Sequence, residues 1–168
     1  MLQSKNDASQ GGVGMSVNMW ITDDQGQHVK GGSQIKGREN SVEVAQIYHS
    51  IYIPFDLDTS VIQGTRKHAP LDILKKIDEA SPFLAKSCCS GKTLQQIRID
   101  LYRVNDHGQE TPFFRYTLND AKVISVSPII TSNGFSLPYL ERISVAYKKI
   151  SWLYLEGNYA HSDSWNKR

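Results

Sequence analysis

Residues 66–91 form the one long stretch of this 168-residue chain whose apolar residues recur at helical rather than alternating spacing. Leu71, Leu74 and Ile77 follow one another at intervals of three, which places them on one face of a helix. Pro70 precedes them, where a helix start tolerates the missing N–H of proline. We therefore predict a first short helix from Pro70 onward, with an apolar face that must cover another part of the fold.

A second short helix is predicted directly after the first. Ser81 is a typical N-cap residue, and Pro82 separates the two helices because the residue before a proline is disfavoured in the α region. Gly91 supplies the usual C-terminal stop. Two short helices in a strand-rich chain most often cover the open end of a barrel or sandwich, so we expect this segment to pack on a β-barrel.

The rest of the chain has the alternating pattern of an antiparallel β-fold. Within residues 42–53 the apolar positions change face, which predicts a β-bulge or a bent strand. Residues 105–108 have the composition of a hairpin tip, and 119–120 and 133–134 predict further breaks between strands. The predicted strands cover residues 17–21, 97–101, 113–118, 121–127, 140–147 and 149–154.

Several of these predicted strands carry apolar residues on both faces. Phe113 alternates with Phe114 and Tyr116, and Val123 alternates with Ile124. An isolated antiparallel barrel is expected to be polar on its outside. Two-sided strands therefore predict that the outer wall is covered, either by the helices or by another copy of the chain.

A loop over residues 54–64 has no clean periodicity but keeps four large apolar residues, Phe55, Leu57, Val61 and Ile62. A loop of this length with exposed apolar groups is uncommon unless it has a partner. We therefore predict that these four residues contact a neighbouring molecule.

Size and charge narrow the classes of partner. Residues 15–168 are long enough for one domain, whereas residues 1–14 have the polar composition of a disordered leader or tag. A formal net charge of +2 gives no general reason to expect nucleic acid as a partner. No apolar run of membrane-spanning length and no secretory signal peptide is visible, so we expect no membrane insertion and either cytoplasmic maturation or unconventional export.

No residue pattern predicts an enzyme. Residues 161–164 contain a histidine, two serines and an aspartate, but adjacent residues cannot place a base on a nucleophile and an acid behind the base. A polar C-terminal turn that places Trp165 against the barrel is the favoured interpretation. His68, near Arg66, has no carboxylate pair or second histidine at a useful spacing, so we predict a structural histidine.

The two cysteines, Cys88 and Cys89, are adjacent in the second predicted helix. Neighbouring cysteines on a helix point in different directions, so we predict free thiols rather than a disulfide. No second ligand pair with zinc-site spacing exists, so we expect neither a bound metal nor any other cofactor.

Motifs along the chain resemble those of one known family. In the stretch 66–91 the matching residues are Arg66, His68, Pro70, Ile77, Asp78, Ser81, Pro82 and Leu84. Later matches, in the same order, are 101–103 with Gly108, 118–121 with Val123, 140–141 with 145–147, 150–152, and 161–165. Over residues 15–168 this order resembles the haemolysin-coregulated proteins, the tube subunits of the bacterial type VI secretion system.

The resemblance implies an antiparallel β-barrel without enzymatic activity that assembles into rings of six copies. It implies that the rings stack into a hollow tube, which a contractile sheath on a baseplate propels from the cell with a spike protein. Small effectors are expected to travel in the lumen, and assembly in the cytoplasm is expected to precede secretion. The same resemblance places Asp106, His107, Gly108, Ser162 and Asp163 near the faces where rings meet.

A function of another class stays open from the residues themselves. A monomeric β-barrel that binds a small ligand in its interior would have similar strands and a similar helical cover. That alternative predicts an accessible internal cavity and the mass of a single chain in solution.

Overall fold

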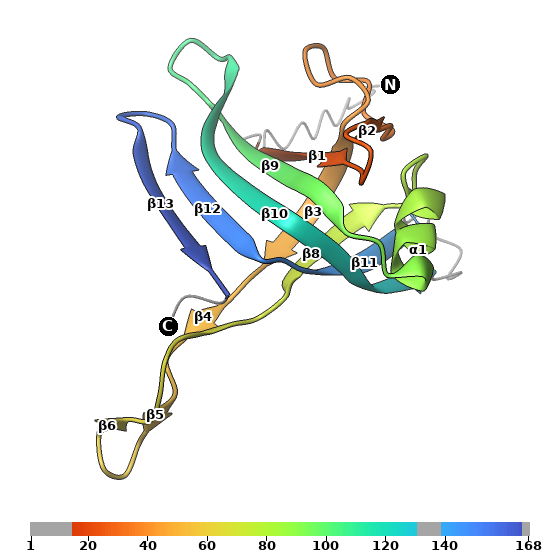
Figure 1. Ribbon diagram of the computed structural model, residues 1–168. Coiled ribbons are helices and arrows are strands. Elements are labelled where there is room, and N and C mark those ends of the chain that lie inside the picture. Colours follow the sequence, from red (N-terminus) through yellow and green to blue (C-terminus); the bar gives the residue numbers. More distant parts are fainter. Residues whose placement is uncertain (1–14, 131–138, 166–168) are drawn as a thin grey trace, which may run out of the picture.

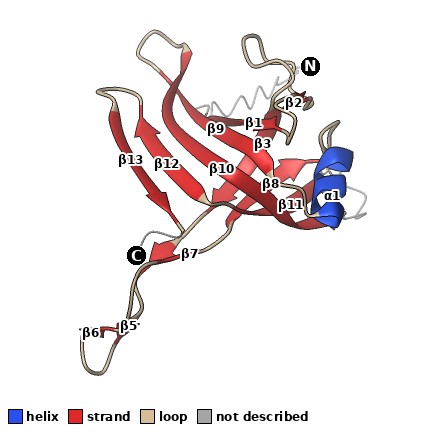
Figure 2. Cartoon of the chain, viewed as in Figure 1, coloured by secondary structure: helices blue, strands red, loops and turns tan. Residues whose placement is uncertain are grey.

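The computed structural model describes residues 15–130 and 139–165. The expected disorder of residues 1–14 and the predicted turn at 133–134 lie outside these ranges. Within them the chain consists mainly of antiparallel strands with one α-helix (Figure 1, Figure 2). The predicted mainly β fold class is confirmed.

Six strands pair into a closed antiparallel barrel. The path of hydrogen-bonded neighbours runs β11, β8, β3, β1, β9 and β10, and β10 pairs in turn with β11. β12 and β13 continue the sheet outward from β10, and β2 pairs with β1. The strands are β1 (Ser16–Thr22), β2 (His28–Val29), β3 (Val42–Tyr48), β8 (Leu71–Lys76), β9 (Leu94–Val104), β10 (Glu110–Ile129), β11 (Leu140–Ala146), β12 (Lys149–Tyr154) and β13 (Tyr159–Ser164).

β10 closes the barrel because it is long enough to serve two parts of the sheet. Its first half pairs with β9 and β12, whereas the part from Lys122 to Ile129 pairs with β11. The predicted break at 119–120 is therefore wrong. Asp120 has a positive φ of 50°, which aspartate adopts more readily than most residues, so the strand accommodates this turn-like position without ending.

The predicted change of face within residues 42–53 is confirmed as a bulge in β3. Val42 and Val44 point into the core, and the register with β8 shifts between Val44 and Gln46. After the shift Ile47 packs against the core, and β3 ends at Tyr48. The chain then leaves the barrel.

The predicted first helix is wrong, because its residues form strand β8. Leu71 and Ile73 point inward with 0% exposure, and the third inward position of the strand is Lys75, also at 0%. A lysine at a core position hides the apolar alternation of the strand. The remaining spacing of Leu71, Leu74 and Ile77 then imitates one face of a helix.

A helix-end cluster of Lys75, Asp78, Ser81 and Glu141 makes the buried lysine tolerable. Lys75 Nζ lies 2.6 Å from Glu141 Oε1, 2.8 Å from Asp78 Oδ1 and 3.0 Å from Ser81 Oγ. The hydroxyl of Ser81 donates in turn to Glu141 Oε1. Buried charges persist in proteins when they are paired and hydrogen-bonded in this way.

The predicted second helix is confirmed as α1 (Ser81–Ser90), which packs against β10 at one end of the barrel (Figure 2). Its N-cap is Ala80 rather than the predicted Ser81, whose hydroxyl belongs to the helix-end cluster. Gly91 ends the helix in a left-handed conformation, with φ at 64°. Leu84 is buried in the core, so the helix covers this end of the barrel as expected. In the described ranges no helix is long and apolar enough to cross a membrane.

Apolar side chains fill the interior of the barrel. They come from every strand of the closed path, which is how alternating strands build one core. β12 also contributes Ile150 to this core, and β13 extends the sheet beyond it. The buried members are Met19, Ile21, Val42, Val44, Leu71, Ile73, Ala80, Leu84, Leu94, Ile97, Ile99, Leu118, Ala121, Val123, Ile143, Val145, Tyr147 and Ile150.

The end of the described chain is a strand, not the predicted polar turn. β13 pairs with β12 along its whole length, and as the outermost strand it needs no apolar face toward a neighbour. The predicted position of Trp165 is confirmed, because its ring centroid lies 5.8 Å from those of His68 and Tyr147.

Candidate functional site

A long hairpin projects from the barrel as an arm, which we define as residues 49–69. Its strands pair twice, near the barrel as β4 (Ile51–Tyr52) with β7 (Lys67–His68), and near the tip as β5 (Phe55–Asp56) with β6 (Val61–Ile62). Figure 1 shows this hairpin reaching away from the sheet, on the far side of the barrel from α1. The arm therefore exposes both of its faces.

The tip of the arm contains the four apolar residues that the sequence singles out as a contact surface. Phe55, Val61, Ile62 and Leu57 are 52%, 54%, 61% and 87% exposed. A carboxylate holds the turn that presents them, since Asp56 Oδ1 accepts the backbone N–H groups of residues 58 and 59 at 2.9 and 3.0 Å. The tip is thus an ordered, apolar projection.

More apolar side chains line the stem of the arm. Ile51, Tyr52 and Ile53 are between 39% and 53% exposed, and Tyr48, the last residue of β3, is 62% exposed. Sequence reasoning assigned this run to a bent strand and missed it as a surface. The available signal was five large apolar residues within residues 47–53, interrupted only by His49 and Ser50.

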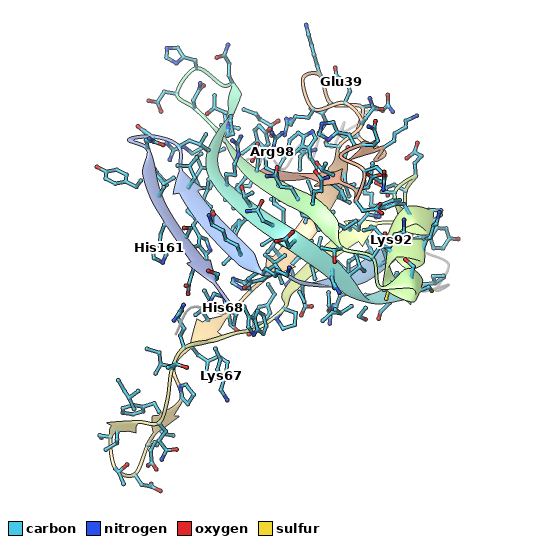
Figure 3. All side chains as sticks on the ribbon, viewed as in Figure 1. Glu39, Lys67, His68, Lys92, Arg98 and His161 are labelled. Atoms are coloured by element: carbon cyan, nitrogen blue, oxygen red, sulfur yellow. The ribbon has the colours of Figure 1, made fainter. Side chains whose placement is uncertain are left out.

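The root of the arm is fixed by an arm-root cluster of His49, Arg66, His68, Tyr147 and Asp163. The hydroxyl of Tyr147 lies 2.6 Å from His49 Nε2 and 3.0 Å from His68 Nδ1. His68 Nε2 lies 2.9 Å from Asp163 Oδ2, and Arg66 forms a bidentate ion pair with the same carboxylate. Figure 3 shows His68 where the arm meets the barrel, with Lys67 farther toward the arm.

Local electrostatics shift the pKa values of three groups in the arm-root cluster. The hydrogen bond from Arg66, followed by that from His68, holds the pKa of Asp163 well below its ordinary value of 3.8. Burial, and then the charge of Asp163, raises the pKa of Tyr147 well above 10.0. Burial, and then the neighbouring charge of His68, lowers the pKa of His49 from 6.5. At neutral pH Asp163 is therefore a carboxylate and Tyr147 a neutral hydroxyl.

The prediction that His68 is structural is confirmed, because it is 7% exposed and hydrogen-bonded at both ring nitrogens. The sequence shows no second histidine at a useful spacing, but the fold brings one close to His68. His49 stands 19 positions earlier, yet its ring centroid is 6.5 Å from that of His68. The pairing of β4 with β7 brings them together, and no spacing in the sequence could indicate it.

The residues that the resemblance places at ring faces lie in two separate regions. Asp106, His107 and Gly108 form the exposed tip of the hairpin between β9 and β10. Ser162 and Asp163 pair with Ser151 and Ile150 near the start of β12. The hairpin that joins β12 to β13 lies at the other end of the two strands. Ser162 is exposed, whereas the Asp163 side chain is 13% exposed and engaged in the arm-root cluster.

No catalytic arrangement forms among residues 161–164 in the structure. His161 stacks on Trp152 with ring centroids 5.6 Å apart, and Asp163 binds His68 rather than His161. Across the described part of the chain no group of three or more His, Cys, Asp or Glu side chains is placed to hold a metal ion. Cys88 and Cys89 are free, as predicted.

One hollow lies at the surface rather than inside the barrel. It has a volume of about 740 Å³ between β1, β2 and β9, and Arg98 lies on its wall with the guanidinium 4.2 Å from the ring centroid of Trp20 (Figure 3). The barrel interior itself is occupied by the apolar core. This packing speaks against the alternative of a ligand held within the barrel.

Comparison with known proteins agrees with this architecture. The family model described as "Type VI secretion system effector, Hcp" matches residues 19–154. The major exported protein of Pseudomonas aeruginosa PAO1 is 28% identical over 139 residues, which are 80% of this chain and 81% of that protein. A doubly substituted Hcp1 from E. coli EAEC 042 is 38% identical with a TM-score of 0.83, over 89% of this chain and 98% of that one.

The secreted protein Hcp3 from Pseudomonas aeruginosa shares the fold, with a TM-score of 0.77 at 24% identity over 92% of this chain and all of that one. The family match begins within β1 and ends with β12, so it includes the barrel, α1 and the arm. The chain therefore belongs to the Hcp (haemolysin-coregulated protein) family of type VI secretion proteins.

Proposed function

We propose that this protein is a structural subunit that forms six-membered rings, which stack into the hollow tube of a type VI secretion system. Family membership supports this proposal. The single observation that carries it is the arm, whose large apolar residues remain between 39% and 87% exposed within the described chain. Burying a Leu or Phe side chain contributes about 1.5–3 kcal/mol, so an exposed set of this size favours contact with a partner.

The arm suits a ring because it makes the contact heterologous. A projection on one side of a subunit that binds a different surface on the next copy generates a closed ring when the rotation between copies closes. We expect each contact to bury roughly 800 Å² per partner, as stable interfaces commonly do. Phe55, Leu57, Val61 and Ile62 at the tip are the proposed contact residues.

The two regions predicted to lie at ring faces fit head-to-tail stacking. The tip at Asp106, His107 and Gly108 and the segment with Ser162 and Asp163 lie apart along the sheet, as two opposite faces of one ring require. Ser162 is the free member of the second region, since Asp163 is engaged within its own chain.

The proposed role is mechanical, not enzymatic, and needs no cofactor. The partners are further copies of the chain, the spike, sheath and baseplate proteins, and small effectors carried in the lumen. Assembly in the cytoplasm and then export to the outside or into a target cell completes the proposed route. The supporting observation is that the candidate catalytic side chains at 161–164 do not meet each other.

Native mass spectrometry tests the proposal. We expect the wild-type protein to give a species of six times the 18.9 kDa chain. Leu57→Asp places a charge in the apolar tip and should weaken each contact at least roughly tenfold, with unchanged far-UV circular dichroism. Leu57→Met keeps the site apolar and should assemble as the wild type does.

Gln25→Asp is a charge-matched control in an exposed turn of the barrel. It should assemble normally. A wild-type chain that stays single at every concentration, or a Leu57→Asp variant that assembles undiminished, would contradict the proposed role of the arm.

A further inference from the structure

The arm-root cluster joins two histidines through one hydroxyl. His49 and His68 lie on the two chain segments that enter and leave the arm, and Tyr147 contacts both rings at 2.6 and 3.0 Å. His68 also faces Asp163 at 2.9 Å. The backbone supports the same junction, since the N–H of Ala69 donates to the carbonyl of Ser50 at 3.0 Å.

The donors and acceptors of this chain of groups can be counted. The carboxylate of Asp163 only accepts, so His68 Nε2 must carry a proton and donate. In a neutral His68 the other nitrogen, Nδ1, accepts from the Tyr147 hydroxyl. The oxygen of Tyr147 then accepts from His49 Nε2, and every group in the chain is satisfied.

One extra proton fits the same geometry. If His68 becomes an imidazolium, both of its nitrogens donate, one to Asp163 and one to the Tyr147 oxygen. The Tyr147 hydroxyl then turns and donates to His49 Nε2, which accepts in the other tautomer. The two hydrogen bonds of Tyr147 to the histidines thus reverse their direction of donation, but no hydrogen bond is lost.

A second extra proton does not fit. Two imidazolium rings would both donate to Tyr147, whose own proton would lose its acceptor, and their centroids are 6.5 Å apart. The groups around them offer little compensation. Asp163 on β13 is already paired with Arg66, Trp152 and Trp165 contribute apolar rings, and His161 lies behind Trp152.

We propose that the arm-root cluster is an acid-sensitive latch that binds one proton while holding the arm and releases the arm root when the second proton binds. His49, the partly exposed member, accepts the second proton and leaves Tyr147. The segment that enters the arm then loses its contact with Tyr147, and the hydroxyl no longer bridges the two segments of the arm root. If the arm joins copies as proposed above, acid also loosens the assembly, and this consequence alone rests on the proposed function.

The direction of the pH effect agrees with the electrostatics of His49. Burial, and then the charge of His68, lowers the pKa of His49 below its ordinary value of 6.5. The unfolded chain therefore binds a proton at a higher pH than the folded arm root does. The stability of the latch is fully present above about pH 6.5 and falls as the pH drops through the window beneath that value.

Hydrogen exchange of the wild-type protein at about pH 7.5 and about pH 5 tests the latch, with rates corrected for the intrinsic effect of pH. We expect the protection of the amides at 50–52 and 67–69 to fall at least roughly tenfold at the lower pH. Amides at 97–101 in β9 report the barrel and should change less than twofold. Unchanged protection at the arm root would overturn the proposal.

His49→Gln removes the second proton site but can keep a donor to Tyr147, because a glutamine amide reaches the position of the Nε2 atom. Its arm root should stay protected at both pH values. His28→Gln makes the same exchange at an exposed site on β2 and should behave as the wild type does. A His49→Gln arm root that opens in acid as the wild-type one does would contradict the latch.

Tyr147→Phe supplies a second, independent variant in case His49→Gln folds poorly. Without the hydroxyl both histidines lose their shared partner, so the arm-root amides should exchange rapidly at both pH values. The ratio of their corrected exchange rates at the two pH values should be near one. Retention of the wild-type ratio in Tyr147→Phe would count against the role of the hydroxyl.

Native mass spectrometry of the same samples separates this inference from the proposed function. Arm-root exchange that rises in acid while the oligomer persists would uphold the latch and show that the arm does not hold copies together. Rings that form at neutral pH with an arm root insensitive to acid would leave the proposed function intact and remove the latch.

Discussion

Two polar clusters fix the two irregular parts of this fold, and they differ in how far water reaches them. In the helix-end cluster the side chains of Lys75 and Glu141 are 0% and 4% exposed. In the arm-root cluster those of Arg66 and Asp163 are 28% and 13% exposed, and histidines complete the network. The first cluster is sealed beneath α1, whereas the second lies at the edge of the barrel.

The difference shows how one chain can hold the start of α1 at every pH near neutrality and hold the arm root in a way that depends on pH. Lysine and glutamate carry fixed charges near neutral pH, and a sealed pair cannot exchange partners with water. Histidine changes its charge between about pH 5 and 8, and an accessible network can take up protons. We therefore expect the helix end to respond to mutation and the arm root to respond also to pH.

The largest effect should follow from Lys75→Met. It leaves Glu141 buried without its charged partner, and removing one member of a buried ion pair costs about 3–5 kcal/mol. Urea denaturation followed by far-UV circular dichroism measures the loss. The double variant Lys75→Met/Glu141→Leu removes both charges and should recover more than half of it.

The wild-type pair would be shown to matter little if Lys75→Met lost less than about 1 kcal/mol. That result would remove the contrast between the sealed and the accessible cluster. Asp78 keeps its backbone partners in both variants, because it accepts the N–H groups of Gly32 and Ala80. It loses its ion pair with Lys75 in both variants, so this loss is common to them and does not affect the difference between them.

A smaller effect should follow from Asp163→Asn in the arm-root cluster. Hydrogen bonds to charged groups contribute about 1.5–3 kcal/mol, and we expect the loss of the charged partner of Arg66 and His68 to cost near the lower limit because the site is partly exposed. The folded-state pKa of Asp163 lies below its ordinary 3.8, so its contribution is present above that pH and is lost as the pH falls beneath it.

The stability of Asp163→Asn should therefore change less than that of the wild type when the pH drops below about 4, as urea titrations across that range would report. The loss expected from His49 starts at a higher pH, near 6.5, and therefore begins before the loss from Asp163. Identical acid curves for the variant and the wild type would mean that Asp163 does not stabilise the folded chain.

The sequence predicted the fold where local patterning and core burial agree. The class, α1, the bulge in β3 and the hairpin tip at 105–108 all follow from apolar spacing and turn residues. The prediction missed strand β8 because Lys75 occupies a core position. Only its partner Glu141, which is distant in sequence, explains how a lysine can be buried there. The predicted break at Asp120 was wrong because β10 continues through this residue despite its turn-like conformation.

The candidate site was predictable only in part, for a similar reason. The apolar tip of the arm is contiguous in sequence, so Phe55, Leu57, Val61 and Ile62 could be identified as an exposed surface. The arm-root cluster is assembled from residues near positions 49, 68, 147 and 163. Strand pairing creates that contact, and the sequence contains no local trace of it.

The smallest effect should follow from Asp56→Ala at the arm tip, which belongs to neither polar cluster. Asp56 organises the turn by accepting the N–H groups of Asp58 and Thr59, and the bond from Thr59 leads in lowering its pKa. We expect faster hydrogen exchange at 57–62 but unchanged exchange at 67–69 and unchanged global stability. Asp58→Ala is the matched control, because it removes a neighbouring exposed carboxylate and should leave the turn ordered. Equal exchange in the two variants would mean that the hairpin pairing of β5 with β6 holds the tip without help from Asp56.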